Sequence, residues 1–399
     1  MLNEEMLALG TKRSVIREIF EYGKSRAAEI GADKVFDFSI GNPSIPAPDC
    51  VKEAIFDIMN TEPSAAVHGY TSAQGAPQAR RAIAAYLSEL HGTKLSPDNL
   101  YLTCGAAASL MITCKAMAVP GDEFIIFAPY FPEYTVYVAA VGAKLVVLPP
   151  DEPDFQIDIE ALRAAITENT KAVLINSPNN PSGAVYSEAS IKALASVLEQ
   201  KEKEYGHPIY LIADEPYREL VYGDIEVPWP IKFYKNTIIC YSYSKSLSLP
   251  GERIGYILVS PELEKADSMY AAVCGAGRAL GFVCAPSLFQ QVIERCQGKT
   301  GDIKAYMENR DLLYGALKEY GYSCVHPDGA FYLFMKTPEA DAEAFCEKAK
   351  KYELLLVAGD GFGAPGYARI SYCVSKEQIE RSLPAFKALA EEYGLTARV

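Results

Sequence analysis

Short apolar segments recur between residues 100 and 259, and they constrain the fold more than any other feature of this sequence. Each is four to six residues long, and they span residues 100–103, 123–127, 144–148, 171–176, 209–213, 237–241 and 255–259. Helical patterns, with apolar residues three and four apart, lie between several of them, as in 187–205. Nearly continuous apolar strands joined by helices indicate a mostly parallel, seven-stranded sheet flanked by helices on both faces.

The pattern changes from about residue 300 onward. A long charged helix is expected over 301–320, followed by short strands in SCVHP, AFYLFMK and ARISYC and by helices near 340–351 and 376–393. This part is predicted to be a smaller α+β domain. The first 45 residues begin with a helix and reach GNPSIPAP, whose prolines cannot continue it. We therefore predict a large domain over 46–295 and a discontinuous small domain made of 1–45 and 296–399.

Charge and cysteine content exclude several kinds of partner. The net charge is −13, and no basic block is present, so a nucleic-acid or anionic-membrane surface is not expected. Ten scattered cysteines without a C-x-x-C pair, and only four histidines, argue against a metal site. The charged N-terminus lacks the apolar region of a signal peptide, and no apolar run approaches the ~18 residues of a membrane span. A cytoplasmic protein with reduced thiols is expected.

Polar residues stand where four of the predicted strands end. These are Asp214 in ADEPY, the turn SPNNPSG, the small residues of CGAAAS, and Lys245 in SYSKS. Each has an ordinary explanation when taken alone: a helix N-cap, a turn, a close strand–helix joint and a solvated lysine. Carboxyl ends of parallel strands meet at one edge of a sheet, so these groups are expected to lie together.

Together, these groups match the needs of pyridoxal 5'-phosphate. That cofactor requires a lysine for a Schiff base and an acidic partner for its pyridinium nitrogen. Its phosphate requires donors, which a helix N-terminus supplies. Gly105, Ala106 and Ala107 are expected to open such a helix, with side chains small enough to let the backbone approach a ligand.

The motifs NNPSG, ADEPY and SYSKSLSLPGERIG, in this order, resemble those of the class I aminotransferases of the fold-type I pyridoxal-phosphate family, the aspartate/aromatic aminotransferase type. The resemblance extends from SIGNPSIPAP to YARISYC. Its most specific part is S-K-x-x-x-x-P-G-x-R-x-G, whereas GAAAS alone is weak. It implies the fold-type I fold, transfer of an amino group from an L-amino acid to a 2-oxo acid by a ping-pong route, and a homodimer with shared active sites.

The resemblance implies roles for four residues around the cofactor ring. Lys245 matches the Schiff-base lysine, whose amine, once displaced, moves the proton between the substrate Cα and the cofactor C4′. Asp214 matches the partner of the pyridinium nitrogen. Tyr217 and Asn180 match the two residues that bond the ring O3′, and Asn179 is not chosen because it does not directly precede Pro-Ser-Gly.

Further residues match the phosphate site and the ring-stacking position. Arg253 matches the phosphate arginine, and Ser242 matches a phosphate hydroxyl, with Ser244 as the less favoured neighbour. The backbone N–H groups of 105–107 complete this set. Phe131 occupies the position of the aromatic ring that stacks on the cofactor, with Tyr130 as the alternative.

Three residues match substrate and subunit contacts. Arg369, in YARISYC, matches the arginine that binds the substrate α-carboxylate, to which the backbone of Gly41 and the side chain of Asn180 also turn. Tyr70, in HGYTSAQG, matches the tyrosine that reaches the phosphate of the neighbouring subunit. A tyrosine confined to a surface loop is the alternative for Tyr70.

Several alternatives stay open at this point. A carbon–sulfur β-lyase uses the same cofactor scaffold, and a non-catalytic ligand-sensing module is a weaker alternative. Glutamate with 2-oxoglutarate is predicted as one substrate pair. Some aspartate-specific bacterial relatives carry a lysine in the phosphate loop where this chain has GAAAS, which weakens the case for aspartate as the donor. Aromatic donors stay open.

Overall fold

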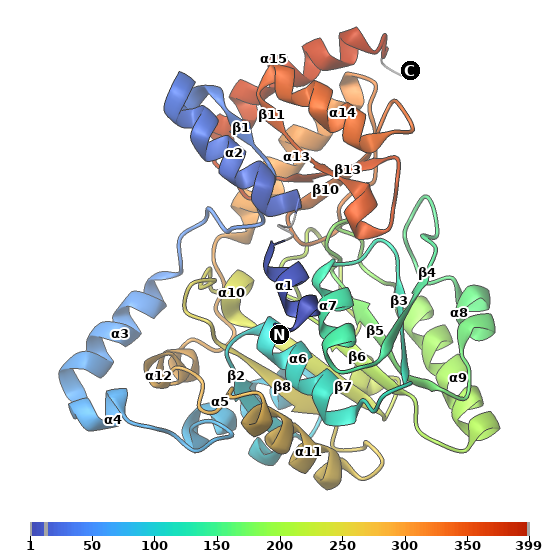
Figure 1. Cartoon of the computed structure of the whole chain (residues 1–399). Helices are drawn as coiled ribbons and strands as arrows, with labels where there is room; N and C mark the ends of the chain where they lie inside the picture. The colour runs from blue at the N-terminus through green and yellow to red at the C-terminus, as the bar shows by residue number, and fades with distance from the viewer. Residues whose placement is uncertain (1, 12–14, 397–399) are drawn as a thin grey trace.

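The computed structural model describes residues 2–11 and 15–396, so residues 1, 12–14 and 397–399 of the predicted small domain lie outside it. A central sheet with its helices forms the lower body in Figure 1, and a smaller α+β unit lies above it. The sheet has the strand order β2-β8-β7-β6-β5-β3-β4. Its strands are β2 (Leu100–Thr103), β3 (Glu123–Phe127), β4 (Lys144–Leu148), β5 (Thr170–Asn176), β6 (Tyr210–Asp214), β7 (Thr237–Ser242) and β8 (Gly255–Val259).

The predicted seven-stranded, mostly parallel sheet is confirmed. The pairs β3–β4, β3–β5, β5–β6 and β6–β7 are parallel, and only β8 runs antiparallel to its neighbours β7 and β2. Strand bounds agree with the sequence prediction within one residue. The differences matter for function, because β6 includes Asp214 and β7 includes Ser242, which the prediction placed just beyond the strands.

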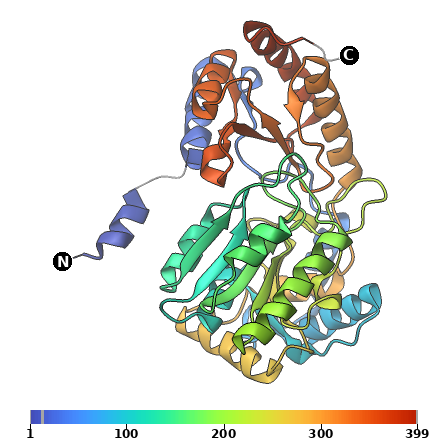
Figure 2. The ribbon, with the colours of Figure 1, turned by 90° about the vertical axis from the view of Figure 1, so that its right-hand side faces the viewer.

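Helices cover both faces of this sheet (Figures 1 and 2). One face packs against helices α3 (Asp49–Thr61), α5 (Pro77–His91), α8 (Ile159–Ala165), α9 (Glu188–Tyr205) and α12 (Ser287–Arg295). The other face packs against α6 (Ala106–Met117), α7 (Glu133–Ala140) and α11 (Ala266–Ala279). Successive strand residues therefore enter two different cores, as their period-2 geometry requires.

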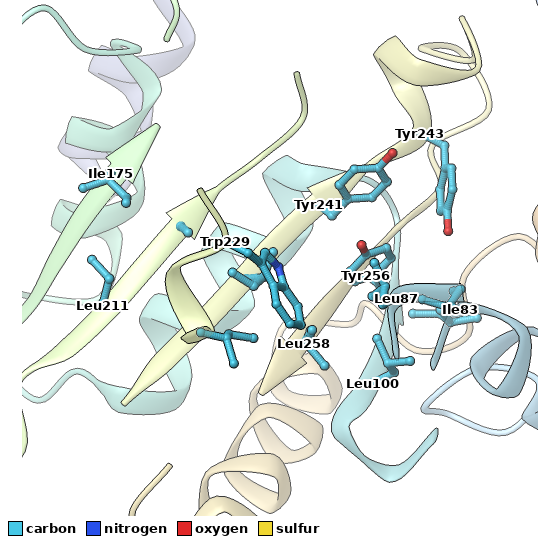
Figure 3. Close-up of a cluster of buried hydrophobic side chains, with 14 of the residues drawn as sticks. Ile83, Leu87, Leu100, Ile175, Leu211, Trp229, Tyr241, Tyr243, Tyr256 and Leu258 are labelled. Atoms are coloured by element: carbon cyan, nitrogen blue, oxygen red, sulfur yellow. The ribbon is translucent and has the colours of Figure 1, made fainter. Parts of the chain in front are cut away.

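Figure 3 shows part of the first core, where Leu100, Tyr256 and Leu258 lie beside Ile83 and Leu87 of α5, while Ile175 and Leu211 of the paired strands β5 and β6 lie further along the sheet. The residues next in sequence, such as Ile212 after Leu211, enter the core on the opposite face. Burial on both sides explains why the strands are apolar throughout rather than alternating. It also fixes the sheet rigidly beneath the edge that carries the polar residues.

The smaller unit contains a four-stranded antiparallel sheet of order β12-β13-β10-β9 and a two-stranded parallel pair, β1-β11. Its strands are β1 (Phe36–Asp37), β9 (Ser323–Cys324), β10 (Tyr332–Lys336), β11 (Leu354–Leu355), β12 (Val357–Ala358) and β13 (Tyr367–Ser371). Its helices are α2 (Val15–Ile30), α13 (Ile303–Glu319), α14 (Ala342–Ala349) and α15 (Lys376–Glu392).

An N-terminal segment completes this unit, since Phe36 of β1 pairs with Leu354 of β11. The division at 45/46 and 295/296 stays a proposal. Helix α1 (Glu4–Thr11) has no buried residue and projects away from the rest of the chain in Figure 2. Among the described residues, no helix combines the length and apolar character needed to cross a membrane.

Candidate active site

A cavity of about 310 Å³ lies where the carboxyl ends of the central strands face the smaller unit. Residues that line it include most of those selected from the sequence: Gly41, Ala106, Ala107, Phe131, Asn180, Asp214, Tyr217, Ser242, Lys245, Arg253 and Arg369. A larger cavity, of about 650 Å³, contains none of them. The smaller cavity is the candidate active site, because it brings together the buried ionisable groups without an ion-pair partner that are described below.

Lys245 lies in the short helix α10 (Tyr243–Ser246), which begins directly after β7. Its Nζ donates to the carbonyl oxygen of Gly41 at 2.6 Å, so a backbone dipole rather than a carboxylate holds it. Burial lowers the pKa of Lys245 to about 8, with a smaller contribution in the same direction from the positive charge of Arg369. At pH 7, about a tenth of this amine is therefore uncharged and nucleophilic, far more than for an ordinary lysine.

Asp214 is the last residue of β6 and is almost fully buried. Its Oδ2 accepts a hydrogen bond of 2.6 Å from the hydroxyl of Tyr134, and its Oδ1 has no partner among the described residues. Burial raises the pKa of Asp214 to about 7. A turn rather than a helix follows β6, so capping does not explain this residue. The free oxygen is suited to a cationic N–H donor.

Asn180 and Tyr217 line the cavity beside these groups. The Oδ1 of Asn180 accepts from Nη1 of Arg369 at 3.0 Å, while the side chain of Asn179 bonds Ser182 inside the turn. Of the two asparagines, Asn180 lines the cavity and Asn179 does not. The hydroxyl of Tyr217 lies 2.9 Å from that of Tyr332.

Arg369, on β13, is only 2% exposed. Its Nη2 donates to the carbonyl oxygen of Ser39 at 2.5 Å, and its Nε has no partner among the described residues. The guanidinium contacts two aromatic rings, 4.7 Å from the ring centre of Tyr332 and 4.9 Å from that of Phe362. Burial lowers the pKa of Arg369. A buried cation held by neutral groups alone retains its capacity to bind a carboxylate.

One corner of the cavity has the features of an anion site. Gly105, with φ 84° and ψ 175°, precedes α6 in a conformation open essentially to glycine alone. A Cβ at Gly105 would lie 2.8 Å from Nη2 of Arg253. Arg253 itself has φ 54°, and its guanidinium donates to the carbonyl oxygens of Pro250 at 2.9 Å and Cys104 at 3.3 Å. A helix N-terminus and a guanidinium thus converge here.

Hydroxyl groups complete this corner. Ser242 caps α10 by accepting from the backbone N–H of Ser244, and the two hydroxyl oxygens lie 2.7 Å apart. Both serines line the cavity, so the neighbour that the sequence ranked second also reaches the site.

Phe131 lines the cavity, whereas its alternative, Tyr130, does not. The ring of Tyr130 is near Gly363 instead, where a Cβ would lie 2.8 Å from a ring carbon. Tyr70 lies outside the cavity and is 99% exposed in the single chain. It makes no contribution to this site within one subunit.

Sequence reasoning missed two tyrosines that contact the selected residues. Tyr134 follows Phe131 in the aromatic stretch YFPEY, and its hydroxyl binds Asp214. Tyr332, in AFYLFMK, lines the cavity and touches both Tyr217 and Arg369. The sequence did place Tyr332 and Arg369 on strands of the same small domain, and this shared domain was the available indication that Tyr332 could reach the site.

Comparison with known proteins identifies the family. The family model described as aminotransferase class I and II matches residues 33–386. A probable aspartate aminotransferase of Methanocaldococcus jannaschii is 31% identical over 388 residues, covering 95% of this chain and 98% of the relative. The chain belongs to the class I and II aminotransferases. A probable aspartate/prephenate aminotransferase of Aquifex aeolicus is also 31% identical, covering 90% of this chain and 91% of the relative.

Solved structures agree with this aminotransferase assignment. The crystal structure of an amino transferase from Eubacterium rectale has 60% identity and a TM-score of 0.97, covering 98% of this chain and 99% of that one. Aspartate aminotransferase from Thermus thermophilus, solved with maleate, has 26% identity and a TM-score of 0.85, with the same coverage. The sequence-based recognition of the family and its fold is confirmed, and the β-lyase alternative is not favoured.

This aminotransferase transfers amino groups between amino acids and 2-oxo acids, and its cofactor is pyridoxal 5'-phosphate. The cavity fits that group. The unpartnered Oδ1 of Asp214 suits the pyridinium N–H, and the space beside Gly105, which a Cβ would fill, suits a phosphate close to Arg253. When bound, the cofactor accepts the electrons that remain when the Cα–H bond breaks.

Proposed function

We propose that Lys245 binds the cofactor and then moves the proton at the substrate Cα. The observation that carries this proposal is a buried amine, with its pKa lowered to about 8, in one cavity with Asp214 and Arg369. A base with a pKa near the working pH transfers protons efficiently. Asp214 holds the pyridinium nitrogen, and Tyr217 and Asn180 hold the ring oxygen O3′.

The phosphate is assigned to the corner formed by residues 105–107, Ser242 and Arg253. Support comes from the helix N-terminus, whose backbone N–H groups have no intrahelical acceptor, and from a permanently charged, forked donor. Phe131 is assigned to the face of the ring, because it is the aromatic side chain of its stretch that enters the cavity next to Ala106 and Ala107.

Arg369 is assigned to the α-carboxylate of the substrate, with Asn180 and the backbone of Gly41 beside it. Binding there would orient the Cα substituents and replace water around the reacting carbon. Glutamate and 2-oxoglutarate are proposed as one substrate pair. For the other pair, aspartate is the first donor to test because two of the relatives described above carry it in their names.

A homodimer with shared active sites is proposed for the working enzyme. Tyr70 is fully exposed in the single chain, and apolar side chains on the surface of α3 are also exposed, Phe56 to 58% and Met59 to 51%. A second copy would cover such groups and bring Tyr70 to its neighbour's phosphate corner. A reducing, cytoplasmic location is proposed because all ten cysteines are free.

The visible spectrum of the purified, cofactor-loaded protein tests the catalytic assignment. Single L-amino acids, added without any 2-oxo acid, should convert the band of the lysine-bound cofactor into that of its amino form. Lys245→Ala should lack the lysine-bound band. An unchanged band in this variant would remove Lys245 from the site, and release of pyruvate and ammonia from cysteine-type substrates would instead support a β-lyase.

Mixed dimers test the shared site. Chains carrying Tyr70→Phe are combined with chains carrying Lys245→Ala, and cofactor retention is measured. If Tyr70 acts across the interface, the only intact Lys245 site in the mixed dimer receives its tyrosine from the Lys245→Ala chain and should hold the cofactor like the wild type. Retention at the level of the Tyr70→Phe homodimer would contradict a contribution from the partner.

A further inference from the structure

Tyr332 contacts both Tyr217 and Arg369, for which the sequence predicted separate roles at the cofactor and at the substrate carboxylate. It is the first residue of β10, only 2% exposed, and it lines the cavity. In the antiparallel register, Phe334 lies opposite Arg369 and Tyr332 lies opposite Ser371. Tyr332 is therefore the diagonal neighbour of Arg369 on the same face of the sheet, within reach of a long side chain.

The hydroxyl of Tyr332 contacts one of these groups. Its oxygen lies 2.9 Å from that of Tyr217, and the two rings meet edge to face with centres 5.7 Å apart. Burial raises the pKa of Tyr332 to about 12 and that of Tyr217 well above its ordinary value, so both hydroxyls keep their protons. Each has one proton to donate. If Tyr217 donates to the cofactor O3′, it is free to accept from Tyr332.

The ring of Tyr332 contacts the other group. The guanidinium carbon of Arg369 lies 4.7 Å from its centre, within cation–π distance, and 4.9 Å from the ring centre of Phe362. Contact with these two rings restricts the orientation of the guanidinium, and its N–H groups still form hydrogen bonds with Asn180 and Ser39. Gly41 shows how closely the ring fits, because a Cβ there would collide with the hydroxyl and lie 2.9 Å from the ring carbon that carries it.

We propose that Tyr332 is a positioning residue whose hydroxyl sets the direction in which Tyr217 donates and whose ring sets the plane of Arg369. This inference rests on the proposed function of the cavity. It assigns two separable effects to one side chain. Removing the hydroxyl disturbs the cofactor end of the site, and removing the ring also disturbs the carboxylate end.

The first test uses Tyr332→Phe and the pH titration of the visible cofactor band. Without the donation from Tyr332, Tyr217 becomes a weaker donor, O3′ holds its shared proton more tightly, and the midpoint should rise by on the order of half to one pH unit. In a Tyr217→Phe background, Tyr332→Phe should add no further shift. The matched control is Tyr222→Phe, another buried tyrosine of the same apolar cluster whose hydroxyl donates to the carbonyl oxygen of Ala330 outside the cavity. The control should leave the midpoint unchanged.

The second test measures binding of 2-aminoisobutyrate, which has an α-carboxylate but no Cα–H bond. Tyr332→Phe keeps a ring beneath Arg369 and should retain affinity within about twofold, while Tyr332→Leu should lose about tenfold. If Tyr332→Leu does not fold, as circular dichroism would show, the Phe variants still decide the hydroxyl role.

These experiments distinguish a failure of the proposed function from a failure of the role proposed for Tyr332. A wild-type protein that takes up no cofactor would overturn the proposed function. A normal wild-type titration with an unmoved midpoint in Tyr332→Phe, or an additive shift in the double variant, would overturn the hydroxyl role alone. Equal affinities of the Phe and Leu variants would overturn the ring role.

Discussion

Replacing Arg369 with alanine removes the cation proposed to bind the substrate α-carboxylate. The side chain is 2% exposed, so its charge is almost fully desolvated before substrate arrives. It donates to two neutral oxygens, those of Asn180 and Ser39, and its Nε has no partner among the described residues. The interaction with an incoming carboxylate is therefore not diluted by a competing protein anion.

The expected loss follows from this desolvation. Removing one member of a buried, hydrogen-bonded charge pair costs on the order of 2–5 kcal/mol. At about 1.4 kcal/mol per factor of ten, kcat/KM for amino acids should fall roughly 30- to 4,000-fold. Because the carboxylate is bound in both the ground state and the transition state, most of the change should appear as a higher KM.

The assay compares each amino acid with the amine that lacks its carboxylate, in single half-reactions followed by the cofactor spectrum. Arg369→Ala should lose activity toward the amino acid and little toward the amine. Arg310→Ala is the matched control, since Arg310 is also buried, lies 4.7 Å from the ring centre of Tyr222 and is hydrogen-bonded to Asp311, outside the cavity. An equal loss for both substrates, or an equal effect of Arg310→Ala, would refute the assignment.

Two further predictions concern the cofactor end. In the cofactor-free protein, Asp214→Asn should be more stable than wild type. Because the pKa of Asp214 is raised in the folded state, ionising this carboxyl group lowers the free energy of unfolding as pH rises from about 4 to about 7. Chemical denaturation should show a difference in unfolding free energy between variant and wild type that grows over this window and reaches at most about 4 kcal/mol above pH 7. A difference that is constant with pH would contradict this. Gly105→Ala should weaken cofactor retention and strain the backbone, since the new Cβ would contact Arg253. The control is Gly92→Ala, because Gly92 has φ 63° and an added Cβ would have no atom within 4 Å. This control should lower the unfolding free energy by only about 1 kcal/mol and leave cofactor retention intact. Equal retention in both glycine variants would argue against the phosphate corner.

The central sheet could be predicted from the sequence because each strand is buried on both faces. Continuous apolar runs bounded by polar turns leave little choice of position, and the predicted bounds differ from the structure by one residue at most. The antiparallel direction of β8 was not predicted, since strand direction depends on the connection rather than on the pattern of apolar residues. The two-residue strands β1, β11 and β12 were also missed, whereas β9, of the same length, lies within the strand predicted in SCVHP.

The site could be predicted only in part, for a related reason. Lys245, Asp214 and Asn180 stand in motifs, at strand ends whose position the fold dictates. Tyr134 and Tyr332 instead contact Asp214 and Tyr217, which lie 80 and 115 residues away in the sequence. No local pattern marks a tyrosine for such a contact, so geometry was needed to find both.

The same geometry explains why this cavity is costly in the absence of its ligands. An amine, a carboxyl group and a guanidinium are buried in it, and for all three burial shifts the pKa toward the neutral form. Each shift records a charge that water would hold more favourably than the protein does. The proposed ligands would offset this cost of burying charge. The cofactor would bind the amine of Lys245 and give Asp214 a cationic partner. A substrate carboxylate would give Arg369 an anionic partner. A ligand that binds only the folded chain adds about 2.7 kcal/mol at a hundred times its dissociation constant, so a cavity poor in internal partners gains stability from the groups it is built to bind.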